Sequence, residues 1–109
     1  MAYAYKVLGQ SAPSATTATD VYTVGAGKQA IISTITVANR SATARTYRIA
    51  IRPAGATLAN LHYIAYDVAL AANDTTALTL GITLTATDVV TVYASTTDLS
   101  FGIFGSEIS

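Results

Sequence analysis

Few residues of this sequence could do chemistry, and the first candidate is the segment Gly25-Ala26-Gly27-Lys28. A phosphate-binding loop has the pattern Gly-x-x-x-x-Gly-Lys-Ser/Thr and opens a helix, whose N-terminal amides hold the anion. Here Gln29 stands where Ser or Thr would bind magnesium, the first glycine comes three residues too late, and strand-type sequence follows. The segment therefore predicts a tight turn before a strand, and no nucleotide site.

The titratable residues form no recognisable catalytic or metal-binding pattern. His62 is the only histidine, which excludes a multi-histidine metal site, and we expect it to be structural or exposed. Asp67 lies on the opposite strand parity from His62. The acids Asp67, Asp74, Asp88 and Asp98 also lack the alternate-residue spacing of a calcium loop. We expect no catalytic residue, no cofactor and no metal, and a protein that is not an enzyme.

The composition indicates a surface that is partly covered by other protein. Charged residues make up only 11% of the chain, against about 25% in a typical soluble domain. The chain has no cysteine, so packing and hydrogen bonds must hold it together. A monomer that stays dissolved usually carries more surface charge than this, and we therefore expect a homo-oligomer.

The zero net charge divides into two opposite halves. Residues 1–60 hold all six basic residues and one acid, for a net charge of +5, and residues 61–109 hold five acids, for −5. Basic strands can pair with acidic ones inside one domain, or copies can meet basic edge to acidic edge. Under the second alternative the interface candidates are Arg40, Arg45, Arg48 and Arg52. A nucleic-acid partner is not expected, because such proteins usually carry a net basic domain or stripe.

Membrane and export signals are not expected either. Polar or charged residues interrupt every apolar run well before the roughly 18–20 residues that a spanning helix requires. The first ten residues, MAYAYKVLGQ, lack the basic region and apolar stretch of a secretory signal. We expect synthesis and folding in the cytoplasm and no membrane partner.

Alternating apolar and polar residues predict strands through most of the chain. In RTYRIAIR the alternation sends Tyr47, Ile49 and Ile51 to one face. The same alternation puts Ile31, Ile35 and Val37 on one face of QAIISTITVAN, and Leu78, Leu80, Ile82 and Leu84 on one face of ALTLGITLT. We expect Val90 and Val92, and Leu99, Phe101 and Ile103, to face inward. A helical turn around residues 57–61 should precede a strand from His62 to Leu70.

Turn signals occur about once per strand, which is typical of an antiparallel sandwich or small barrel. We predict an all-β fold, an antiparallel β-sandwich of jelly-roll or Ig-like type with about 7–8 strands. Residues 20–109 should form the single sandwich domain, and residues 1–19 an N-terminal strand and extended arm. That strand carries Tyr3 and Tyr5, and it could pair with its own sheet or with a neighbour's.

The tyrosines are either core residues or interface anchors. Tyr63 and Tyr66 should lie on opposite faces of one strand, so one of them should point outward as an interface anchor or a sugar platform. We take Tyr66, together with Tyr3, Tyr5 and the four arginines, as the candidate interface residues.

Three segments of the chain resemble a known family: residues 21–51 (VYTVGAGKQAIISTITVANRSATARTYRIAI), residues 62–95 (HYIAYDVALAANDTTALTLGITLTATDVVTVYAS) and the closing FGIFGSEIS. They are similar to the small β-sandwich virion proteins of tailed bacteriophages. In that family a Tyr-x-Val-Pro-Ala-Gly-Lys-like turn opens a strand that ends near an Asn. This chain has Gly25 where the family pattern prefers proline.

The resemblance implies a non-enzymatic component of the phage particle, made in the host bacterial cytoplasm and located in the virion. We expect a capsid cement or decoration protein that stabilises the particle by binding between shell subunits. The alternative is a tail-, neck- or baseplate-associated module that binds host surface glycan. The expected partners are other copies of the chain, with a trimer as one form, and the major capsid or tail proteins.

Overall fold

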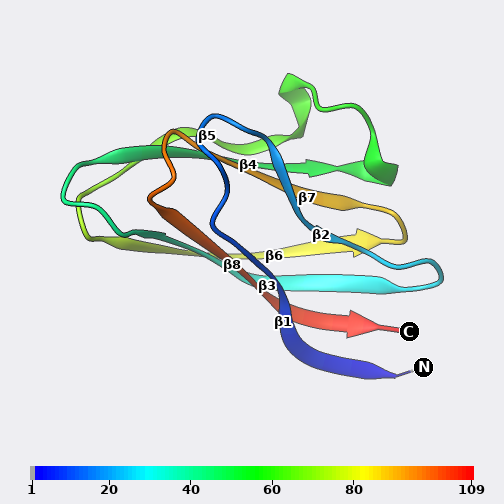
Figure 1. Ribbon diagram of the computed structural model, residues 1–109. Coiled ribbons are helices and arrows are strands. Elements are labelled where there is room, and N and C mark those ends of the chain that lie inside the picture. Colours follow the sequence, from blue (N-terminus) through cyan, green and yellow to red (C-terminus); the bar gives the residue numbers. More distant parts are fainter. Residues whose placement is uncertain (1) are drawn as a thin grey trace.

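Eight strands and two short 3-10 helices make up the computed structural model, which describes residues 2–109 (Figure 1). The strands are β1 (Tyr3–Ser11), β2 (Thr19–Thr23), β3 (Gln29–Asn39), β4 (Arg45–Arg52), β5 (Tyr63–Leu70), β6 (Thr75–Thr85), β7 (Val89–Ala94) and β8 (Leu99–Ile108). The 3-10 helices are η1 (Pro53–Gly55) and η2 (Asn60–His62). Neither helix in this part of the chain is long and apolar enough to cross a membrane.

The strands form two four-stranded sheets, ordered β1-β8-β3-β6 and β2-β7-β4-β5. Every pair of neighbouring strands in the described part of the chain is antiparallel. Apart from β4 and β5, strands that follow one another along the chain lie in opposite sheets, which is the arrangement of an eight-stranded jelly roll. The expected all-β sandwich is confirmed, and of its two forms the chain adopts the jelly roll.

The core fills the space between the two sheets. From the first sheet, Ile35 and Ile103 are fully buried, and from the second, Ile49 and Val90. The Tyr47 ring packs edge-to-face on Phe101 across this space, with ring centroids 6.3 Å apart. The predicted inward positions in β4, β7 and β8 are therefore confirmed for Tyr47, Ile49, Val90, Val92, Leu99, Phe101 and Ile103.

A bulge in β3 and β6 reverses part of the predicted pattern. The pairing of the two strands shifts between Ile32 and Thr34, and Gly81 opposite has φ +65°, a conformation that glycine adopts readily. The extra residue changes which side chains face inward. Ile32 is buried, whereas Ile31 and Leu80 are exposed, so Ile31 does not share the buried face of Ile35 and Val37 as predicted, and Leu80 is not buried with Leu84.

A bulge in β5 also changes the predicted pattern. The predicted strand is present as Tyr63–Leu70 and follows the short helix η2. Its pairing with β4 shifts between Ile49, which pairs with Ala65, and Ala50, which pairs with Tyr63, so Ile64 is an extra residue between them. This bulge brings Tyr63 and Tyr66 into contact with ring centroids 4.9 Å apart, so the prediction that they lie on opposite faces is wrong.

The Gly-x-Gly-Lys segment is a turn between β2 and β3, as the sequence predicts. The Lys28 N–H donates to the Gly25 carbonyl at 3.2 Å, and Gly27 has φ +73°. Strand β3 begins at the next residue, Gln29.

The N-terminal strand belongs to the first sheet. β1 pairs with β8, and the blue N-terminal and red C-terminal strands lie side by side in Figure 1. Beyond a bulge after Val7, Gly9 lies so close to β2 that a Cβ there would be 2.5 Å from the Val21 carbonyl oxygen. Further along, Ala15 forms an isolated bridge with Ala94 of β7. The segment before β2 thus contacts both sheets.

Candidate functional site

Exposed apolar side chains gather on the outer surface of the sheet β1-β8-β3-β6. The strand register sets Tyr5, Ser106 and Ile31 in one row across β1, β8 and β3. Neighbouring rows on the same surface place Tyr3 beside Ile108, and Val7 beside Phe104. We call the exposed residues of this surface the apolar face; they are Tyr3, Tyr5, Val7 and Ile31.

The apolar face contains a shallow hollow of about 550 Å³, lined chiefly by Tyr3, Tyr5, Ile31, Phe104 and Ile108. Tyr5 is the most exposed large apolar residue of the described chain, at 86%. Transfer of apolar side chains from water to contact with another apolar surface is favourable. The hollow is therefore a candidate contact surface for protein.

The charged side chains, in contrast, are largely engaged within the chain. Five ion pairs are present among residues 2–109: Lys6–Glu107, Lys28–Glu107, Arg45–Asp98, Arg48–Asp67 and Arg52–Asp20. Four of these five join the basic half of the sequence to the acidic half. This geometry favours the first of the two charge alternatives, in which basic and acidic strands meet inside one domain.

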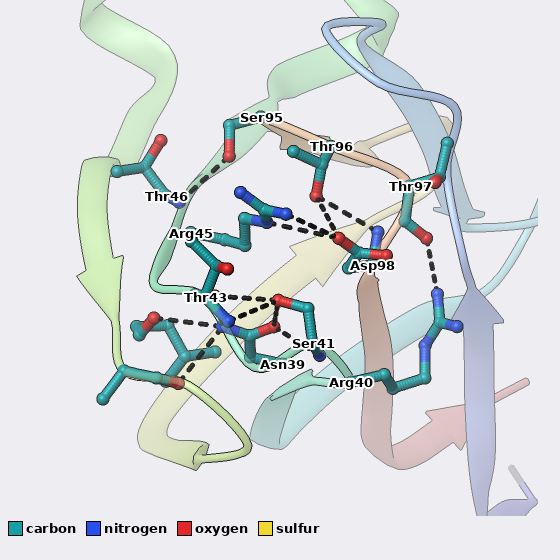
Figure 2. Close-up of polar contacts among 12 residues, drawn as sticks. Asn39, Arg40, Ser41, Thr43, Arg45, Thr46, Ser95, Thr96, Thr97 and Asp98 are labelled. Carbon is teal, nitrogen blue, oxygen red and sulfur yellow. Dashed lines mark hydrogen bonds and ion pairs between the residues drawn. The ribbon is translucent and has the colours of Figure 1, made fainter.

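Two of the candidate interface arginines tie loops together at one end of the sandwich (Figure 2). Arg40 donates to the Ser100 hydroxyl at 2.8 Å and to the Thr97 carbonyl. Arg45 contacts the Asp98 carboxylate at 3.1 Å. Because these contacts join the β3–β4 and β7–β8 connections, both arginines have a role inside the chain.

Asn39 organises the same end of the molecule (Figure 2). Its side chain is buried; Nδ2 lies within hydrogen-bond distance of the carbonyls of Thr43, Leu70 and Ala71. Its Oδ1 accepts from the Ser41 amide and hydroxyl, at 3.0 and 2.9 Å. A single buried amide thus holds the β3–β4 and β5–β6 connections together.

A polar cluster closes the opposite end, where Glu107 of β8 meets β2. The Tyr22 hydroxyl donates to Oε2 of Glu107 at 2.8 Å, while Lys6 and Lys28 contact Oε1 at 3.1 and 3.4 Å. The Tyr22 bond, followed by the two lysines, lowers the pKa of Glu107 from 4.5 to about 2. Burial, and then Glu107, raise the pKa of Tyr22. The cluster links the two sheets by charge-assisted hydrogen bonds.

Aromatic and charged side chains also meet on the outer surface of the second sheet. The Arg48 guanidinium lies 4.2 Å from the ring centroid of Tyr66 and 4.3 Å from that of Tyr93. Both oxygens of Asp67 accept from Arg48, and these bonds raise the pKa of Arg48 and lower that of Asp67. Beside them, Asn60, Tyr63 and Tyr66 line a second hollow of about 430 Å³.

His62 does not join this aromatic group. Its side chain is buried, and Nδ1 accepts from the Ala59 N–H at 3.0 Å, which makes it a structural residue, one of the two roles expected for it. Across residues 2–109, no three acidic, histidine or cysteine side chains come together in a way that could hold a metal ion.

Comparison of the chain with protein-family models, with curated proteins and with solved structures found no match. The class of protein is therefore defined by its own geometry: an eight-stranded jelly-roll sandwich with exposed apolar side chains on its outer surface and ion pairs within the chain.

Sequence reasoning found part of the apolar face and missed the rest. Tyr3 and Tyr5 were candidate interface residues, and both lie on it. A strict two-residue period groups Ile31 with Ile35 and Val37, and Leu80 with Leu84, although Ile31 and Leu80 are exposed. Glycine inside a strand pattern often marks a bulge, so Gly81 was the available signal for Leu80.

Proposed function

We propose that this chain is a non-enzymatic structural protein of a tailed-phage particle, a capsid cement or decoration protein that binds between shell subunits. The observation that carries the proposal is the apolar face. Contiguous exposed apolar patches on small domains mark interaction sites. Four large side chains on one sheet surface, Tyr3, Tyr5, Val7 and Ile31, fit that description.

The charge arrangement supports binding to protein. Each of the six basic side chains contacts an acceptor in the same chain, so little unpaired charge surrounds the apolar face. Burying this surface against a shell would need little desolvation of ions, which is the main cost of covering charged groups. Many copies with modest individual affinity would then stabilise a shell through multivalency.

A second candidate is a tail-, neck- or baseplate-associated module that binds host glycan. The observation that favours it is the hollow at Asn60, Tyr63 and Tyr66, because aromatic rings with nearby polar groups suit sugars. Jelly rolls occur among both viral capsid and lectin domains, so the fold is compatible with either candidate.

The test is to delete the gene from the phage that encodes the chain and to measure two properties of the particles. We expect deletion particles to release their DNA at a lower temperature while adsorbing to host cells normally. Loss of adsorption by particles of normal heat stability would overturn the cement proposal in favour of the glycan-binding module.

A matched pair of variants locates the binding surface. Ile31→Asp places a charge on the apolar face, and Ile64→Asp places the same charge on the other sheet, where the isoleucine is similarly exposed, at 46% against 41%. When the deletion phage is complemented, Ile31→Asp should leave far fewer copies on purified particles than Ile64→Asp does. Equal copy numbers would show that the apolar face is not the binding surface.

A further inference from the structure

We propose that two copies of this chain pair through the edge strand β1, antiparallel about a twofold axis at Tyr5, and so form one continuous eight-stranded sheet. The proposal rests on the geometry of β1 and not on a role in a phage particle. It goes beyond the proposed function by naming the self-association surface and its register.

The outer edge of β1 is open at Tyr5 and Val7. β1 is the terminal strand of its sheet, and within residues 2–109 its one ladder partner is β8. Ala2 and Ser109 exchange both of their backbone hydrogen bonds, at 2.9 Å each. Since bonded and non-bonded pairs alternate in an antiparallel ladder, Ala4 and Lys6 turn their backbone groups toward β8. Tyr5 and Val7 therefore direct their N–H and C=O groups away from the sheet.

Few features of this edge would block pairing with another strand. Natural sheets usually protect such edges with proline, bulges, charged side chains or a covering segment. The stretch Tyr3–Val7 contains no proline and keeps an unbroken register with β8. Its one charged residue, Lys6, binds Glu107. The bulge and the contact with β2 come only later, at Gly9.

The edge is complementary to itself when the twofold axis lies at Tyr5. With Tyr5 opposite Tyr5 of the second copy, Lys6 lies opposite Ala4, and Val7 lies opposite Tyr3. Moving the axis to Lys6 would set two lysines directly opposite each other, which is unfavourable. A shift by a single residue would set the Tyr5 side chain against the wrong face of the partner strand.

The occupant that best fits this edge is therefore a second copy of the chain. This twofold pairing keeps the outer surface of the sheet β1-β8-β3-β6 on the same side in both copies. Tyr3, Tyr5 and Val7 of the two copies then form one apolar ladder, and the apolar face doubles in area. The contact is isologous and closes at two copies.

The test uses the intact chain and measures its mass by light scattering over a concentration series. We expect the wild-type protein to be a dimer. Tyr5→Pro removes an N–H that points away from the sheet, which an edge strand tolerates, and it should weaken the dimer by at least about tenfold. Circular dichroism should show the same strand content in both proteins. A wild-type monomer throughout the series, or a dimer that Tyr5→Pro leaves unchanged, would overturn the proposal.

A disulfide provides a second measurement that does not depend on the proline variant. The chain has no cysteine, so Tyr5→Cys introduces a single thiol. Bonded antiparallel pairs have Cα atoms about 5.5 Å apart, within the range of a disulfide. Under mild oxidation, Tyr5→Cys should form covalent dimers much faster than the control Thr79→Cys, which lies on β6 at the other edge of the same sheet. Equal cross-linking rates would contradict the proposed register.

Discussion

The polar cluster around Glu107 offers the sharpest prediction about stability. Replacing Glu107 with Gln keeps the shape of the side chain and removes its charge. Lowering the pKa of this carboxyl from 4.5 to about 2 stabilises the folded chain by at most roughly 3.4 kcal/mol at neutral pH, because each pKa unit corresponds to about 1.4 kcal/mol. Lys6 and Lys28 are nearly half exposed and therefore screened by water. We expect Glu107→Gln to lower the free energy of unfolding by about 2 kcal/mol at pH 7.

The pH dependence gives the sign of the effect. Because the pKa of Glu107 is lower in the folded than in the unfolded chain, its contribution is complete above about pH 4.5 and is lost as the pH falls toward 2. Urea denaturation of wild type and variant should therefore show a constant difference between pH 7 and pH 5, which shrinks as the pH falls further. A difference that does not change with pH, or a variant as stable as wild type at pH 7, would refute this reasoning.

Two further substitutions test the packing and the loop contacts. Gly105→Ala would place a Cβ 2.0 Å from the Ile31 carbonyl oxygen, so β3 and β8 would have to separate; we expect a loss of roughly 2–3 kcal/mol by urea denaturation, and a loss below about 0.5 kcal/mol would contradict the close approach. Asn39→Ala removes the amide that holds two connections and should cost roughly 2–4 kcal/mol, because several buried hydrogen bonds to both connections are lost together. An equally stable Asn39→Ala variant, measured by thermal unfolding, would show that the loops do not depend on this residue.

The fold class was predictable from the sequence because apolar and polar residues alternate along a strand that buries one face. Tyr47 and Ile49 in β4, and Val90 in β7, face the core as their period indicates. The turn at Gly25–Lys28 was also predictable, since its glycines and the strand sequence that follows both exclude a phosphate loop.

The bulges mark the point where the two-residue period fails. A bulge adds one residue to a strand, and its position depends on how two strands that are distant in sequence pair with each other. Ile31 and Leu80 are consequently exposed, although the period groups them with buried residues, and Tyr63 lies against Tyr66. The apolar face could not be assembled from the sequence because it combines residues of β1 and β3, which lie on either side of β8, and the alternation does not reveal the order of strands in the sheet.

The proposal of a capsid decoration protein is tested most directly by a cryo-electron microscopy reconstruction of the phage that encodes this chain. We expect copies of the sandwich on the outside of the capsid, with the apolar face turned toward the shell and covering junctions between its subunits. Sandwich density found only at the tail, neck or baseplate, or copies on the capsid with the apolar face turned to solvent, would contradict it.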